Sequence, residues 1–230
     1  KKISLATLLL SSLGFLATNL NASEANHHVL FQQNCASCHG VDRLGLIGPA
    51  LLPENLKRVR KKQAIASISN GLPATQMPAF GATLNAEEIK SLVDYIYTPL
   101  PEMPQWDEQT ISKHHVIYKP ELLEGSADTA TPIYKADPLN VFLVVEAGDH
   151  HVSVLNGDTF ETLHRFTSRY ALHGGPKYTS DGRFVYFASR DGWVTKYDMY
   201  NLQVVAETRV GINARNLAVS GDNKHVLVGN

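Results

Sequence analysis

Cysteine is scarce in this chain of 230 residues: the sequence holds two, and both lie in the stretch "CASCH", from Cys35 to His39. A zinc site needs four ligands, and no second pair of cysteines or histidines stands at the spacing of a zinc finger. A redox-active dithiol normally lies on a strand-to-helix turn of a thioredoxin-like fold, and no β-α-β pattern surrounds these cysteines. The sequence therefore argues against both kinds of site.

An excess of either charge is also missing. Lys and Arg number 21, Asp and Glu number 22, and the formal net charge is −1. No run of basic residues follows the first two, so a nucleic-acid partner bound through its phosphates is not expected. The apolar fraction of 43% is ordinary for a globular protein and argues against disorder throughout.

The N-terminus has the features of a targeting segment. Two lysines precede the apolar stretch "ISLATLLLSSLGFLATNL", and small residues follow in "NASEA". This order predicts a secretory signal peptide, residues 1–25, cleaved after Ala22 or Ala25, and thus a periplasmic protein. A retained membrane anchor is the alternative, but Ser, Thr and Asn interrupt the apolar run. Because the sequence stops at Asn230 inside another apolar run, we expect a longer protein.

The motif C-x-x-C-H is itself the attachment signal for heme c. Cys35 and Cys38 have the spacing that bonds the two vinyl groups, and His39 follows where its imidazole can ligate iron. Met77, in the turn-rich stretch "GLPATQMPAFG", is the predicted sixth ligand, since a thioether there suits electron transfer. Its alternative role is that of a core filler. Three other residues could take the sixth position: Met103, His27 and His28.

A helix is predicted at the end of this segment. Asn85 and Glu88 have the spacing of a capping box. Apolar residues then recur at i, i+3, i+4 and i+7, which makes one stripe that can lie against the heme: Ile89, Leu92, Val93 and Ile96. Residues 26–98 resemble a class I cytochrome c domain over their whole length. This resemblance implies an all-α fold, a covalent heme c and a role in electron transfer.

From residue 99 the composition changes. Prolines punctuate residues 99–132, which are predicted to form a surface linker. The pattern then becomes strand-like, and "NVFLVVEAGDHHVSVLNGDTFETLHRF" can be laid on "RFVYFASRDGWVTKYDMYNLQVVAET" at an offset of 42 residues, with a third copy beginning at "DNKHVLVGN". Repeats of roughly 40–45 residues built from short β runs are typical of propeller blades, whereas a β-sandwich would not repeat at a fixed interval. Residues 133–230 are thus predicted to be the first blades of an all-β propeller.

Two features interrupt this repeat. His173 stands in "YALHGGPKY", predicted to be a connection between blades, where Gly174 and Gly175 would let the backbone approach a flat ligand. Arg215 lies in the corresponding turn of the next repeat, and Arg190 lies in a tight hairpin. One imidazole and two guanidinium groups suit a metallotetrapyrrole that carries several carboxylates. The alternative is that His173 bonds to backbone in a turn and that both arginines are surface charges.

A cytochrome c domain followed by a propeller is the layout of the cytochrome cd1 family, and the stretch from Arg169 to Ser220 resembles the first two blades of that family. The resemblance implies an eight-bladed propeller with heme d1 on its axis. It also implies that His173 is the proximal ligand of the d1 iron and that Arg190 and Arg215 lie near the carboxylates. The family comprises a nitrite reductase and proteins of heme d1 biogenesis. The stretches "LHGGPK" and "VEAGDHHV" look like the biogenesis branch, and the cytochrome c domain favours its dehydrogenase member.

The resemblance to this dehydrogenase member implies oxidation of a propionate of dihydro-heme d1 to an acrylate, with the electrons leaving through heme c. The implied partners are the tetrapyrrole substrate, small redox proteins as electron acceptors, and other heme d1 biogenesis proteins or nitrite reductase. His150 and His151 are the candidate general bases, because a tight hairpin at the propeller rim can aim one ring inward; solvent-facing histidines are the alternative. Two other functions remain open: reduction of nitrite to nitric oxide, and a heme d1 carrier without chemistry. Residues 1–230 alone are expected to be inactive.

Overall fold

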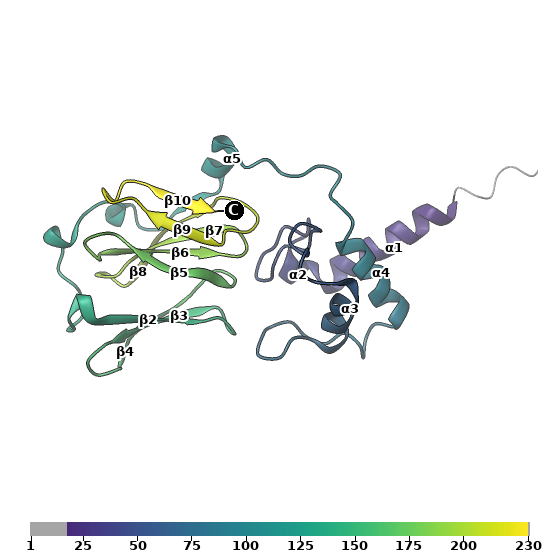
Figure 1. Cartoon of the computed structure of the whole chain (residues 1–230), viewed down its shortest axis with the longest axis horizontal. Helices are drawn as coiled ribbons and strands as arrows, with labels where there is room; N and C mark the ends of the chain where they lie inside the picture. The colour runs from purple at the N-terminus through teal and green to yellow at the C-terminus, as the bar shows by residue number, and fades with distance from the viewer. Residues whose placement is uncertain (1–17, 230) are drawn as a thin grey trace, which may run out of the picture.

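The structure, a computed structural model, describes the main chain of residues 18–229 and the side chains of residues 26–229 except that of His173. Helices occupy the first part of the chain and strands the second, with a long connecting segment between them (Figure 1). The predicted signal peptide, residues 1–25, falls largely outside the described residues. Among the helices that are described, none combines the length and the apolar character needed to cross a bilayer.

The helical domain contains α1 (Thr18–Asn34), α2 (Ala36–His39), α3 (Lys61–Asn70) and α4 (Ala86–Ile96). The start of α4 is capped as predicted: Asn85 Oδ1 accepts from the N–H groups of Glu87 and Glu88 at 3.0 and 2.9 Å, and the Glu88 carboxylate accepts from the Asn85 N–H at 2.8 Å. These bonds satisfy N–H groups that a helix start leaves without partners. The predicted apolar stripe of α4 is buried and packs against α1 and α3: Ile89, Leu92, Val93 and Ile96.

A buried arginine ties the loop after α2 to the end of α4. Arg43 is 2% exposed, and its Nη1 donates to the carbonyl oxygens of Tyr95 at 2.6 Å and Thr98 at 2.9 Å. The guanidinium carbon lies 4.4 Å from the centre of the Tyr95 ring. Because the last carbonyls of a helix lack intrahelical partners, this cation both closes α4 and holds the loop that follows the two cysteines.

The connecting segment is more than the surface linker that its prolines predict. It contains α5 (Glu108–Lys113), β1 (His115–Ile117) and two short 3-10 helices, η1 (Pro120–Leu122) and η2 (Ala127–Thr129), and a third, η3 (Pro138–Asn140), follows it. β1 pairs antiparallel with β8 (Gln203–Arg209), with His115 opposite Thr208. A three-residue strand carries too little pattern to be recognised in a sequence, and its partner lies far along the chain. The segment thereby becomes the outer strand of a sheet.

Three sheets follow one another along the described part of the chain after residue 140. The first has the order β2 (Val141–Glu146), β3 (His151–Asn156), β4 (Thr162–Thr167). The second has the order β1-β8-β7-β6-β5, with β5 (Leu172–Tyr178), β6 (Phe184–Ser189) and β7 (Trp193–Asp198); β9 (Asn216–Val219) and β10 (Val226–Gly229) form the third. β3 begins at residue 151 and β7 at residue 193, which is the offset expected from the sequence. The first two sheets therefore repeat one propeller-like unit.

The core of this β-domain lies between the first and second sheets. Val152 and Val154 on β3 are fully buried in one cluster with Phe187 and Tyr197 of the second sheet. Residues two apart on a strand face the same side, so one face of each sheet is apolar. At the far end of the second sheet, Arg183 Nη2 donates to Asp198 Oδ2 at 3.1 Å, and this buried pair fixes the turn after β7.

Candidate functional site

The two cysteines lie around a single helical turn. α1 ends at Asn34, Cys35 precedes α2, and Cys38 lies within α2. Both thiols are free and half-buried, which leaves them accessible to a covalent partner. Burial, followed by the neighbouring Cys38, raises the pKa of Cys35 to about 11. Because so few molecules would carry a Cys35 thiolate at neutral pH, the pair is poorly suited to thiol–disulfide exchange.

His39 ends α2 and is 8% exposed. Its Nδ1 lies 2.8 Å from the Pro49 carbonyl oxygen, which can only accept, so Nδ1 carries the proton and Nε2 keeps a lone pair for a metal. Burial lowers the pKa of His39, which favours the neutral, metal-binding form. Gly48 lies against the ring: a Cβ there would be 2.9 Å from His39 Cε1 and 3.0 Å from Nδ1. The loop thus fixes the imidazole as an axial ligand requires.

Met77 lies in the loop between α3 and α4. Its side chain is partly buried against the helical core. The loop is closed by a hydrogen bond from the Leu72 N–H to the Met77 carbonyl at 3.1 Å, and by one from the Met77 N–H to Thr75 Oγ1 at 3.2 Å. Gly71 has a φ of 69°, and a Cβ on it would lie 2.8 Å from the Met77 carbonyl oxygen. The loop is therefore a fixed support for a thioether.

The other residues considered for the sixth ligand position have different surroundings. The rings of His27 and His28 lie 5.0 and 6.1 Å from the ring of Tyr95 on α4. Met103 is 39% exposed in the connecting segment. The helical domain thus offers what a covalent heme c requires, namely two accessible thiols, an imidazole with an available Nε2 and a supported thioether: Cys35, Cys38, His39 and Met77.

In the β-domain, the stretch "YALHGGPKY" is a strand and not the predicted connection between blades. His173 lies in β5 opposite Ala188 of β6, and the register then breaks until Lys177. Gly174 and Gly175, with φ angles of 80° and 70°, supply the left-handed backbone of this bulge. Two glycines and a proline in succession look like a loop in a sequence, which explains the error. The side chain of His173 lies outside the described part of the chain.

The two glycines have different neighbours. A Cβ on Gly174 would lie 2.5 Å from the Arg215 carbonyl oxygen and would also overlap the Asn216 side chain, so this glycine allows β9 to approach β5. A Cβ on Gly175 would meet Lys177 Nζ at 3.8 Å, which is ordinary contact. Only Gly175 fits the prediction that the backbone leaves room for a flat ligand.

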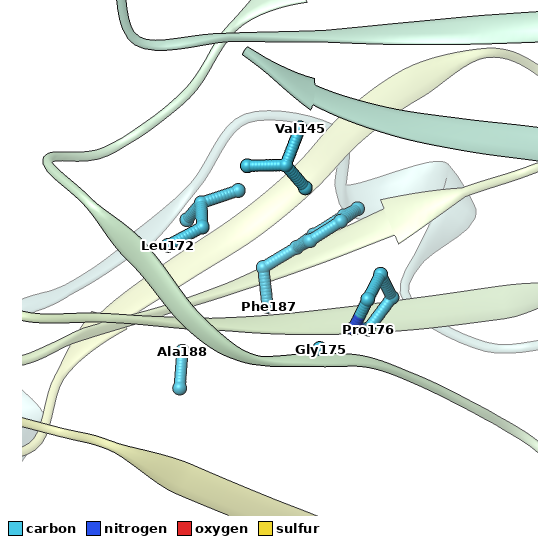
Figure 2. A pocket seen from close by; sticks show the side chains of 6 residues that line it. All are labelled: Val145, Leu172, Gly175, Pro176, Phe187 and Ala188. Atoms are coloured by element: carbon cyan, nitrogen blue, oxygen red, sulfur yellow. The ribbon is translucent and has the colours of Figure 1, made fainter. Parts of the chain in front are cut away.

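A cavity of about 210 Å³ lies beside Gly175 (Figure 2). The residues around it are mostly apolar and come from β2, β5 and β6: Val145, Leu172, Gly175, Pro176, Phe187 and Ala188. In Figure 2 the Phe187 ring lies between Val145 and Pro176. Ligand pockets usually measure roughly 300–1,000 Å³, so this space suits one edge of a tetrapyrrole and not the whole macrocycle.

The backbone brings the predicted tetrapyrrole residues to one end of the second and third sheets. Arg190 directly follows β6, and its N–H donates to the Tyr170 carbonyl at 3.3 Å, just before β5 begins. Arg215 directly precedes β9, and its carbonyl oxygen lies against Gly174. His173 is the second residue of β5. The main-chain positions of the three residues therefore lie close together although they are spread over about forty residues of sequence.

The two histidines predicted as general bases differ in their surroundings. His150 lies in the β2–β3 turn with its ring 5.3 Å from that of Tyr170, and its buried Nδ1 has no hydrogen-bond partner among the described residues. Burial lowers the pKa of His150, so its ring is neutral at pH 7. His151 Nδ1 lies 2.9 Å from the Asp149 carbonyl, and its Nε2 lies 3.4 Å from Thr167 Oγ1. Of the two, His150 is the one with an unpaired ring nitrogen.

Sequence reasoning missed two residues at the same end of the β-domain. Arg209, at the end of β8, donates from Nη2 to the Leu44 carbonyl at 2.6 Å, and this contact joins segments 165 residues apart. Asp191 is buried in the β6–β7 turn, and burial raises its pKa to about 6 despite the nearby Arg169 and Arg209. No local pattern marks either residue, because both depend on contacts between distant segments.

Comparison with known proteins accounts for both parts of the chain. The family model of the cytochrome D1 heme domain matches residues 136–230. The model of subunit III of the cbb3-type cytochrome c oxidase matches residues 22–96. The first match covers every strand from β2 to β10, and the second covers most of α1 and all of α2, α3 and α4.

Individual relatives combine these parts. A dihydro-heme d1 dehydrogenase of Pseudomonas aeruginosa is 54% identical over 95% of this chain and 43% of its own length. Cytochrome c55X of Stutzerimonas stutzeri is 35% identical over 44% of this chain and 88% of its own length. The nitrite reductase of that organism is 27% identical over 86% of this chain and 37% of its own length. The solved structure of dihydro-heme d1 dehydrogenase NirN in complex with DHE superposes with a TM-score of 0.78, covering 89% of this chain and 43% of that one. The chain thus spans less than half the length of the dehydrogenase.

Proposed function

The chain belongs to the cytochrome cd1 family, and from this premise we propose that it acts in heme d1 biogenesis as a c-type cytochrome that oxidises a propionate of dihydro-heme d1 to an acrylate. The observation that carries the proposal is the 54% identity to the dihydro-heme d1 dehydrogenase across both domains, against 27% to the nitrite reductase. We also propose that the protein works in the periplasm, as the predicted signal peptide implies, and that its sheets belong to an eight-bladed ring.

Four residues of the helical domain would hold heme c. The thiols of Cys35 and Cys38 would form the covalent links, and His39 Nε2 and the Met77 sulfur would be the axial ligands. The Pro49 carbonyl keeps the proton of His39 on Nδ1, so the imidazole can bind a metal without first losing a proton from Nε2. When bound, heme c supplies one-electron redox chemistry.

The tetrapyrrole substrate would bind at the end of the β-domain where β5 begins. His173 is the proposed ligand of its iron, and Arg190 and Arg215 are the proposed partners of its carboxylates, because guanidinium groups pair with carboxylates in a bidentate geometry. The apolar cavity beside Gly175 would receive one edge of the ring. The rest of the pocket would come from the part of such a protein that this chain does not span.

The proposed reaction converts a CH2–CH2 unit into CH=CH and releases two electrons and two protons. A bound heme c would pass one electron at a time, so two oxidised small redox proteins outside this chain would be needed to take both electrons; one proton would go to a base of the protein and the other to solvent. The product would then pass to other heme d1 biogenesis proteins or to nitrite reductase.

A base must accept a proton from the side chain of the substrate, and His150 is the better supported of the two candidates. Its Nδ1 is buried without a partner among the described residues, and its lowered pKa keeps it neutral and able to accept a proton at pH 7. His151 is already engaged with Asp149 and Thr167. We therefore propose His150 as the proton acceptor and His151 as a support of the turn.

The test is an anaerobic incubation of the complete protein with dihydro-heme d1 and an excess of an oxidised small redox protein, followed by mass analysis of the extracted tetrapyrrole. We expect the substrate to lose two hydrogens while two molecules of the redox protein become reduced. The double variant Cys35→Ala/Cys38→Ala, which cannot attach heme c, should leave the mass unchanged. An unchanged mass in the parent protein together with rapid production of nitric oxide from nitrite would identify a nitrite reductase, and the absence of both reactions would identify a carrier.

A further inference from the structure

The β-domain touches the helical domain at the two loops that carry the predicted iron ligands. Arg209, the last residue of β8, donates from Nη2 to the Leu44 carbonyl at 2.6 Å and from Nε to the Gly211 carbonyl at 3.3 Å. Leu44 lies in the loop that follows His39. On the other side, a Cβ on Gly148 in the β2–β3 turn would lie 3.3 Å from the Ala74 carbonyl oxygen, in the loop of Met77.

The contact of Arg209 continues through one peptide group to His39. The Leu44 carbonyl and the Gly45 N–H belong to the same peptide unit, and the Gly45 N–H donates to the carbonyl oxygen of His39 at 2.9 Å. A charged donor on the carbonyl of a peptide polarises that peptide and strengthens the hydrogen bond that its N–H makes. Two consecutive hydrogen bonds therefore join the guanidinium of Arg209 to the main chain of His39.

The guanidinium itself is held in place by its surroundings. Its central carbon lies 5.3 Å from the centre of the Trp106 ring, and the Trp106 ring lies 5.6 Å from that of His114. Both aromatic residues belong to the connecting segment, so this segment also contacts the arginine. A planar cation that stacks on a ring and bonds two carbonyls at once has little freedom to move.

We propose that Arg209 is a positioning residue that docks the β-domain on the heme c loop and, through the Leu44–Gly45 peptide, fixes the main chain of the axial histidine. This role rests on the proposed function in one respect: the docking by Arg209 would set the path for electrons from the tetrapyrrole end of the β-domain to heme c. Its structural consequence does not depend on that function. Without Arg209 the Gly45 N–H would lose protection and the environment of His39 would change.

The test compares Arg209→Gln with Arg209→Lys in the complete, heme-loaded protein. The matched control is Arg58→Gln, which removes an exposed arginine from the helical domain. Amide hydrogen exchange of Gly45 reports the hydrogen bond, and spectroelectrochemistry reports the potential of heme c. We expect Gly45 to exchange at least about tenfold faster in Arg209→Gln, as the loss of a charged hydrogen bond predicts, together with a shifted potential. Arg209→Lys keeps one charged donor and should restore part of the protection.

Parent-like exchange at Gly45 and a parent-like potential in Arg209→Gln would overturn the proposal. So would an equal effect of Arg58→Gln. If Arg209→Gln does not fold, Gly148→Trp provides the second variant, because its Cβ would already lie 3.3 Å from the Ala74 carbonyl and its bulk would crowd the Ala74 loop at the same interface. Faster exchange at Gly45 in Gly148→Trp supports the docking role, and parent-like exchange contradicts it. Both readouts work without substrate, so a protein that shows these effects but no oxidation of dihydro-heme d1 would refute the proposed function alone.

Discussion

At the scale of single residues, Gly48 illustrates how a missing side chain can set the orientation of a ligand. In Gly48→Ala the new Cβ would lie within 3.0 Å of two atoms of the His39 ring, so the ring must tilt away from the Pro49 carbonyl. Loss of such an outer-shell bond costs roughly 10–100-fold in metal affinity. Protons should then displace His39 from iron at a pH about 1–2 units higher, which an acid titration of the heme spectrum measures. Gly221→Ala, with open space around it, is the control.

Asp191 predicts a dependence of stability on pH. Its pKa is raised from 3.8 to about 6, so the folded protein binds the proton more tightly than the unfolded chain does. The free energy of unfolding at this site is therefore greatest below about pH 4, falls as the pH rises towards 6, and stays low above. Asp191→Asn removes the buried charge and can still accept a hydrogen bond from Ser189. The difference in free energy of unfolding between the variant and the parent should therefore be about 2 kcal/mol larger, in favour of the variant, at pH 7 than at pH 4.5.

Urea unfolding followed by tryptophan fluorescence measures this difference, because Trp193 lies two residues from Asp191. A gain of the same size at both pH values would show that the carboxyl does not titrate in this range in the folded protein.

At the scale of elements, the bulge in β5 makes a prediction about its two glycines. Gly174→Ala places a methyl group against the Arg215 carbonyl and the Asn216 side chain, whereas the methyl group of Gly175→Ala makes only an ordinary contact with Lys177 Nζ. Each substitution places a Cβ on a left-handed backbone, which lowers the free energy of unfolding by about 1–2 kcal/mol. Gly174→Ala in addition forces β9 away from β5. Hydrogen exchange in β9 should accelerate in Gly174→Ala and stay near that of the parent in Gly175→Ala. Equal exchange rates in β9 of both variants would contradict the conclusion that Gly174, and not Gly175, allows β9 to approach β5.

The same elements show how much of the fold could be predicted from the sequence. The start and the apolar stripe of α4 were predictable because the cap and the helical period are local, and C-x-x-C-H is a signal in itself. β5 was misplaced because Gly-Gly-Pro is typical of loops, while here the glycines form a bulge inside a strand. β1 could not be foreseen in a segment rich in proline, because its only evidence is its pairing with β8. The contact of Arg209 with Leu44 depends on how the two domains meet.

At the scale of the whole molecule, the chain combines two proposed sites that are built differently. The residues proposed to hold heme c come from one continuous stretch of the helical domain, so each of them has a recognisable spacing. The residues proposed to bind the tetrapyrrole lie at strand ends in two successive sheets, which the repeat brings together. Between the domains, Arg209 bonds the Leu44 carbonyl and Gly148 lies close to the Ala74 carbonyl. This arrangement predicts that each site can be disabled without loss of the other.

Two single variants test this independence. Met77→Ala should keep heme c attached through Cys35 and Cys38 but lower its reduction potential, because a thioether ligand raises the potential. Binding of dihydro-heme d1 should be unchanged. His173→Ala should show the opposite pattern, with tetrapyrrole binding weakened roughly 10–100-fold and the heme c potential like that of the parent. Spectroelectrochemistry measures the first quantity and optical titration the second.

For each variant a different measurement would contradict the prediction. An unchanged potential in Met77→Ala would move the sixth ligand to Met103 or to one of the histidines near Tyr95. Parent-like binding in His173→Ala would leave His173 as an ordinary residue of the β5 bulge. If instead either variant disturbs both sites, the two sites are coupled, and the contact of Arg209 with Leu44 and the close approach of Gly148 to the Ala74 loop provide a route between them. Because Met77 lies in the loop that Gly148 touches, the tetrapyrrole affinity of Met77→Ala is the measurement that decides between independent and coupled sites.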